Sequence, residues 1–241
     1  MANPMDQFII KPLVPIKIGG FDISFTNSSL AMVLAVIFSI ILLSVYFIGK
    51  RSIIPSKTQL IPESIYSLVL GIIRENAGEK GLKYSPFIFS IFLFVAFGNL
   101  SGLLPYNFTF TSHVAAVGTL AVSALLFNMF VGIKNKGFGY FRIFLPKGIP
   151  LALAPLVVPI ETISLLSKPF SLTVRLVANM TVGHIMLKII AGFVVGLGIA
   201  GVVPLVFSSL VVAFEVFIAL IQTYIFTVLS TIYLSDAING H

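Results

Sequence analysis

Residues 165–180 read LLSKPFSLTVRLVANM and place one arginine, Arg175, in the middle of a strongly apolar stretch. Apolar runs of the same kind continue from residue 149 to residue 234, with only a few ionisable side chains among them. A helix crosses a bilayer core with about 20 apolar residues, and an arginine at that depth costs at least about 2.5 to 3.5 kcal/mol. The stretch therefore predicts a membrane-embedded helix whose arginine has a function.

The composition of the whole chain indicates the same class of protein. Of its 241 residues, 58% are hydrophobic and only 10% are charged, and the mean hydropathy is +1.09. A soluble domain has about 25% charged residues. A soluble enzyme, a disordered chain and a disulfide-rich secreted domain are therefore excluded, and we predict an all-α polytopic membrane protein. The net charge of +7 lies in short loops between apolar segments, which favours contact with lipid headgroups over nucleic-acid binding.

We expect one membrane domain, 1–241, with about five hydrophobic helices. Glycines between residues 192 and 201, followed by Pro204, divide the last apolar region into two long helices that form a membrane-embedded hairpin. The expected segments are an outer N-terminal segment at 1–28, a first span at 29–49, an inner loop at 50–83, a helical hairpin at 84–133, a second inner loop at 134–148 and the charged hairpin at 149–241.

The basic residues of the two expected inner loops predict the orientation. Short loops rich in lysine and arginine stay on the cytoplasmic or matrix side, which places the N-terminus outside and, after five crossings, the C-terminus inside. Within the first of these loops, residues 61–74 have helical apolar spacing, and we expect an amphipathic helix at the inner membrane surface. The basic residues are Lys50, Arg51, Lys57, Arg74, Lys80, Lys83, Lys134, Lys136, Arg142 and Lys147.

Polar residues form a stripe along each of the last two expected helices. Glu161, Lys168 and Arg175 are spaced by seven residues, which returns to nearly the same face of a helix, and Glu215 and Gln222 repeat this spacing. Intramembrane charges mark ion or proton paths by default, although a structural ion pair between Glu161 and Lys168 is an equal alternative.

The ionisable residues of these helices differ in what they can do. Arg175 keeps its proton at any relevant pH, so it must find a carboxylate or water. His184 and Glu215 can titrate and suit a proton relay. His184 comes nine residues after Arg175, half a turn out of phase, so we expect the two side chains on different faces.

Three stretches resemble the subunit a family of F-type ATP synthases, and the resemblance extends over most of the chain. They are the arginine-containing residues 165–180, residues 220–234 (LIQTYIFTVLSTIYL) and residues 98–106 (GNLSGLLPY). Some bacterial members have a Glu at the position of His184 and a His at the position of Glu215. In having His184 and Glu215 instead, this chain resembles mitochondrial and alphaproteobacterial members. The same holds for Gly102, which is an Asp in some bacterial relatives.

The resemblance implies a non-catalytic subunit that translocates protons through two offset half-channels against a rotating ring. It gives proton translocation to Arg175, Asn179, His184, Glu215 and Gln222, and an inner half-channel to Glu161, Ser167, Lys168 and Ser171. The implied partners are a ring of small rotor subunits carrying a carboxylate, peripheral-stalk subunits, the rest of the ATP synthase and the lipid bilayer. We expect no cofactor, metal or nucleic acid, and a location in the bacterial inner (plasma) membrane or the mitochondrial inner membrane.

Two other classes of function remain open from the residues. A secondary transporter usually has two similarly interrupted halves, which this chain lacks, and a haem-bearing respiratory subunit needs more histidines than the one inside the expected spans. A purely structural assembly subunit would use its buried charges to fix helix register, and it would tolerate lysine in place of Arg175.

Overall fold

The structure, a computed structural model, describes residues 8–19, 21–48, 57–104, 108–137, 139–140 and 153–239. Several residues of the expected inner loops lie outside this part of the chain, namely Lys50, Arg51, Arg142 and Lys147.

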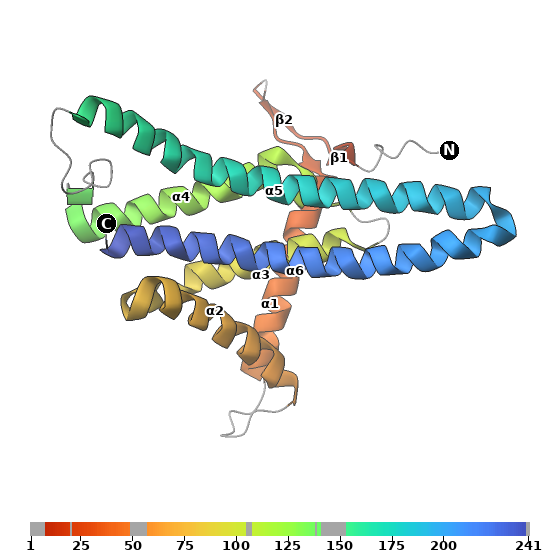
Figure 1. Cartoon of the computed structure of the whole chain (residues 1–241), viewed down its shortest axis with the longest axis horizontal. Helices are drawn as coiled ribbons and strands as arrows, with labels where there is room; N and C mark the ends of the chain where they lie inside the picture. The colour runs from red at the N-terminus through yellow and green to blue at the C-terminus, as the bar shows by residue number, and fades with distance from the viewer. Residues whose placement is uncertain are drawn as a thin grey trace. The chain divides into compact units, whose positions relative to one another are not determined.

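The described residues form an all-α protein with five helices long and apolar enough to cross a membrane, which confirms the predicted fold class (Figure 1). The first, α1, spans Asn27–Ile48 and has no charged side chain. The helices that follow are α2 (Lys57–Gly81), α3 (Ser85–Gly102), α4 (Val114–Lys136), α5 (Ala154–Gly196) and α6 (Val202–Asn239). α2 and α3 together make one of the five membrane-length stretches, Gln59–Gly102. The expected interfacial helix, 61–74, lies within α2, which is followed by the short helix η2 (Leu82–Tyr84).

The last two helices are much longer than a simple membrane span. α5 has 43 residues and α6 has 38, so at about 1.5 Å per residue each is longer than a hydrocarbon core of about 30 Å. They are separated by the predicted glycine break. Gly198 adopts φ +57°, which a side chain would disfavour, and it begins the short helix η6 (Gly198–Gly201). An added Cβ on Gly201 would clash with the backbone of Val194, so this turn requires glycine.

Short strands precede the first span, in the segment 1–28 for which no strand was predicted. β1 (Pro12–Val14) pairs antiparallel with β4 (Phe25–Thr26), and β2 (Lys17–Ile18) pairs with β3 (Phe21–Asp22). Asn27, the first residue of α1, accepts a hydrogen bond from the Lys11 backbone and donates one to the carbonyl of Ile9. These hydrogen bonds therefore join the residues before β1 to the start of α1.

The chain divides into two compact units, each built from separate segments. Unit 1 comprises Met1–Leu42, Leu93–Val117 and Arg175–Thr223, and unit 2 comprises Leu43–Phe92, Gly118–Val174 and Tyr224–His241. The single membrane domain stays a prediction.

A buried asparagine anchors α6 in each unit. In unit 1, Asn99 of α3 is fully buried and its amide nitrogen lies 3.4 Å from both the carbonyl of Ala219 and the hydroxyl of Thr223. In unit 2, the amide of Asn128 on α4 donates to the carbonyl of Ser230 over 3.4 Å. Hydrogen bonds of this kind stabilise helix contacts where water is excluded, so both halves of α6 are held by neighbouring helices.

Candidate functional site

Arg175 lies on an exposed face of α5, in unit 1. Among the residues that the structure describes, its guanidinium has no hydrogen-bond or ion-pair partner. Since arginine does not escape its charge by losing a proton, an exposed arginine on an apolar helix needs a partner outside this chain or water. The isolation that the sequence predicted for Arg175 is thus also seen in the fold.

One turn after Arg175, a side-chain hydrogen bond joins α5 to α6. The amide of Asn179 donates to the Oε1 atom of Gln222 over 3.4 Å. Gln222 is 2% exposed. Its neighbour in the chain, Thr223, is the residue whose hydroxyl accepts a hydrogen bond from Asn99 of α3. The two amides that the sequence analysis singled out are therefore in contact, although 43 residues separate them.

A pocket of about 220 Å³ lies beside this contact, within unit 1. Asn179 and His184 contribute from α5, and Glu215 contributes from α6, together with apolar side chains such as Phe214. Arg175 is not among the lining residues. The structure thus brings the two residues proposed for a proton relay to one pocket.

Glu215 is 7% exposed and lies directly against the backbone of Gly183. A Cβ added to Gly183 would stand 2.7 Å from Oε1 of Glu215 and 2.9 Å from its carboxyl carbon, so a larger residue at 183 would force this carboxyl group to shift. Among the described residues, neither carboxyl oxygen has a hydrogen-bond partner. A carboxyl group with free acceptor positions beside a pocket suits the uptake and release of protons.

His184 is held from two directions. Its Nε2 atom lies 3.0 Å from the hydroxyl of Thr109, in the segment between α3 and α4. The ring of Phe8, from the N-terminal segment, packs edge-on against the imidazole with 6.4 Å between centroids. Three parts of unit 1 that are far apart in sequence therefore meet at this histidine.

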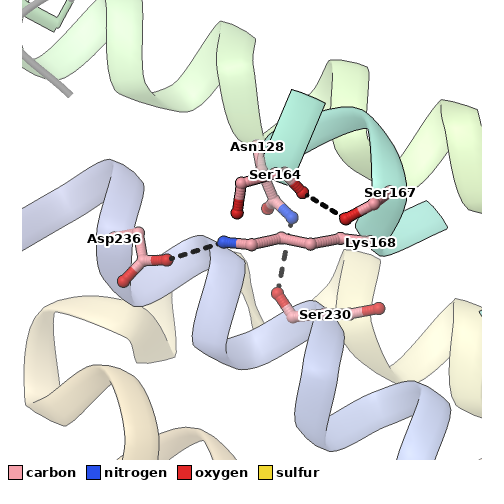
Figure 2. Close-up of polar contacts among 6 residues, drawn as sticks. All are labelled: Asn128, Ser164, Ser167, Lys168, Ser230 and Asp236. Carbon is pink, nitrogen blue, oxygen red and sulfur yellow. Dashed lines mark hydrogen bonds and ion pairs between the residues drawn. The ribbon is translucent and has the colours of Figure 1, made fainter. Parts of the chain in front are cut away.

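A second polar cluster lies in unit 2, around Lys168 (Figure 2). The Nζ atom of Lys168 lies 3.8 Å from Oδ2 of Asp236 and 4.9 Å from the centroid of the Tyr233 ring, both on α6. The side chains of Lys168 and Asp236 are 31% and 22% exposed. The carboxylate that pairs with Lys168 is therefore Asp236. It is not Glu161, so the alternative of a structural ion pair between Glu161 and Lys168 is wrong.

The other expected inner residues lie near this cluster without joining it. Glu161 is half-buried and has no hydrogen-bond or ion-pair partner among the described residues. Ser167 donates to the carbonyl of Ser164 on its own helix over 2.8 Å, and Ser171 is exposed. Near the same end of α6, burial and the Asp236 carboxylate raise the pKa of Tyr140.

Sequence reasoning missed several of these residues. Asp236 is the last acidic side chain of the chain and lies in the last turns of an apolar helix, a signal that could have identified it. Gly183 directly precedes His184, but nothing local shows that a glycine there receives a carboxyl from another helix. Thr109 has no sequence signal, because its importance depends on a contact with a residue 75 positions away.

The fold and the site together define an integral membrane protein with titratable side chains inside its long helical hairpin. The sequence model of the family described as ATP synthase A chain matches residues 29–235, and the chain belongs to this family.

Curated relatives are similar over their full length. The chain is 51% identical, over 245 aligned residues, to a protein of Rhodospirillum rubrum named ATP synthase subunit a. It is 48% identical, over 248 aligned residues, to a protein of Paramagnetospirillum magneticum with the same name. Both alignments cover 100% of this chain and 100% of the relative.

Proposed function

We propose that the chain is the proton-conducting stator subunit of the membrane motor of an F-type ATP synthase. Its family and the pocket that brings His184 and Glu215 together support this function. In this proposal the chain makes and breaks no bond with ATP and acts in the bacterial plasma membrane. Its partners are a ring of small rotor subunits that carry a carboxylate, the peripheral stalk and the rest of the complex.

Arg175 faces the ring and separates two half-channels. Its fixed positive charge favours the deprotonated form of an arriving ring carboxylate, so the carboxylate releases its proton into the inner path. The same charge repels a proton that would cross directly from one half-channel to the other. The exposed position of Arg175 and its lack of a partner among the described residues fit a contact with a second protein.

The outer half-channel includes Asn179, His184, Glu215 and Gln222. Protons pass between the outside and the ring through the pocket, where His184 and Glu215 take them up and release them. The Asn179–Gln222 hydrogen bond lies between this pocket and the turn that bears Arg175. Proton flow then drives rotation because each charge moved down the membrane potential releases about 2.3 kcal/mol per 100 mV.

The inner half-channel is formed around Glu161, Ser167, Lys168 and Ser171 of α5. The half-buried Glu161 is the group of this set that can accept a proton from the ring. Lys168 is held by Asp236 and Tyr233, so we assign it to holding α5 against α6 and place Asp236 at the inner end of the path.

Replacing His184 tests the proposed function. We expect the His184→Ala variant, in membrane vesicles with normal amounts of assembled complex, to lose most of its proton-driven ATP synthesis, because the outer path loses a titrating group. ATP-driven acidification of the vesicles should fall in parallel. Full coupled activity in this variant would contradict the outer path described above, and a loss of assembled complex would be detected by purifying the complex.

Charge reversal tests the role of the Lys168–Asp236 pair. We expect Lys168→Asp and Asp236→Lys each to lower the thermal stability of the complex by a small amount, on the order of 1 kcal/mol or less, because the partly exposed pair is screened. The double variant should recover part of this stability. A double variant that recovers stability but not proton flux would show that the pair lies on the inner path and is more than structural. The matched control is reversal of the Arg74–Glu79 pair, which is 59% and 78% exposed and should have no effect.

A further inference from the structure

The hydroxyl of Thr109 takes part in two hydrogen bonds at once, and it has one proton to give. Oγ1 donates to the carbonyl of Gly102, the last residue of α3, over 3.2 Å. The same oxygen lies 3.0 Å from Nε2 of His184. Since a hydroxyl has one donor and two acceptor positions, the bond to His184 must use a lone pair of the threonine oxygen. The proton of that bond therefore belongs to Nε2 of the histidine.

We propose that Thr109 is a positioning residue for His184, which keeps a proton on Nε2 and leaves proton exchange to Nδ1. In the neutral imidazole the proton is on Nε2 and Nδ1 is the acceptor, and in the imidazolium both nitrogens are protonated. The bond to Thr109 is satisfied in both states. The proton that the relay moves thus enters and leaves at one defined nitrogen, an assignment that rests on the proposed function of His184.

The burial of Thr109 and its neighbours Gly102 and Phe8 support this contact. Thr109 is 5% exposed, and a Cβ on Gly102 would stand 2.8 Å from its hydroxyl oxygen, so glycine at 102 lets the threonine approach. The Phe8 ring packs edge-on against His184 and restrains the ring further. A partner that fixes the tautomer of a histidine also sets the orientation of its free nitrogen, as second-shell partners do in metal sites.

The charged or titratable groups near His184 lie on α5 and α6. Lys188 lies one turn further on α5, and Glu215 of α6 lines the same pocket. The histidine that follows Thr109 in the chain, His113, stacks on Phe108 at 4.9 Å between centroids. None of these groups is altered by a substitution at Thr109, so a change in pH dependence reports on the contact itself.

The test compares Thr109→Val with Thr109→Ser in the whole complex, reconstituted in liposomes. We expect the Val variant to lower proton-driven ATP synthesis by roughly three- to tenfold at neutral pH, the effect of losing one hydrogen bond, and to shift its pH profile. The Ser variant, which keeps the hydroxyl, should restore both. Thr111→Val is the matched control, since Thr111 is equally buried in the same segment and its hydroxyl has no partner among the described residues. It should leave rate and pH profile unchanged.

Nitrogen-15 NMR of labelled histidine in the same complex separates this proposal from the proposed function. The His184 signals, identified by their loss in a His184→Gln variant, should show the Nε2-protonated tautomer in the unaltered complex and a mixture in Thr109→Val. Gly102→Ala, which displaces Thr109 but keeps its hydroxyl, should give the same mixture. A single Nε2 tautomer in Thr109→Val, or a Ser variant as impaired as the Val variant, would overturn the role of Thr109. Normal ATP synthesis in His184→Gln would instead overturn the relay, whatever the tautomer.

Discussion

Replacing Arg175 with alanine should abolish coupled activity while leaving the complex assembled. A positive charge within about 4 to 6 Å changes the proton affinity of a carboxyl group by roughly 10- to 1,000-fold, so ring carboxylates that meet no guanidinium will not release their protons on time. We expect proton-driven ATP synthesis and ATP-driven acidification to fall by at least about a hundredfold. Because Arg175 is exposed and makes no hydrogen bond or ion pair with the described part of its own chain, its loss should not destabilise the fold.

Lysine at the same position distinguishes a functional from a structural arginine. Arg175→Lys keeps one positive charge but loses the planar, permanently charged group, and lysine in an apolar site can become neutral. We expect this variant to remain severely impaired, whereas a subunit that uses Arg175 only to fix helix register would accept lysine. Arg74→Ala is the control, since Arg74 is an exposed arginine of α2 and its removal should leave synthesis intact. Normal coupling in Arg175→Lys would rule out the role assigned to the guanidinium.

Glu215→Gln should cause the second large loss. Glutamine keeps the size and shape of the side chain at this buried position but cannot accept or release a proton. We expect proton-driven ATP synthesis to fall by about tenfold or more, the range of a lost acid–base group. Exchanging the two groups, with Glu at 184 and His at 215, should retain more activity than Glu215→Ala, because one carboxyl and one imidazole remain. Full activity in Glu215→Gln would exclude this residue from the path.

Filling the space beside the carboxyl tests the same site without changing any ionisable group. Gly183→Ala adds a Cβ 2.7 Å from Oε1 of Glu215, so the carboxyl must shift and we expect a partial loss of proton flux. Gly192→Ala is the matched control, because it makes the same substitution in α5 where a Cβ would meet nothing within 4 Å. Equal activity in both variants would show that the position of the Glu215 carboxyl does not limit the path.

Much of the fold and part of the site could be predicted from local features of the chain. The five hydrophobic helices and the glycine turn before α6 follow from runs of apolar residues and from residues that favour or break a helix. Each of these properties depends on neighbours within a few turns, which the sequence displays directly.

The pairings across helices could not be predicted in this way. The hydrogen bond between Thr109 and His184 joins residues 75 positions apart, and the one that Asn99 donates to Thr223 joins residues 124 positions apart. Asp236, and not Glu161, pairs with Lys168 because α6 lies beside α5 at that point, although Glu161 is on the same face of the same helix. Which of several polar groups meet depends on how helices pack, and no local pattern encodes that choice.

The sequence by itself therefore determined the class of protein, the helices that enter the membrane and the isolation of Arg175, since the cost of placing charge in an apolar segment is a property of the segment. Only the tertiary structure decided that Glu215 lies against Gly183, that His184 is held by Thr109 and that Lys168 is held by Asp236. The physical reason is that hydrophobicity and helical period act along the chain, whereas hydrogen bonds and ion pairs between helices require atoms to meet within about 3 to 4 Å in space.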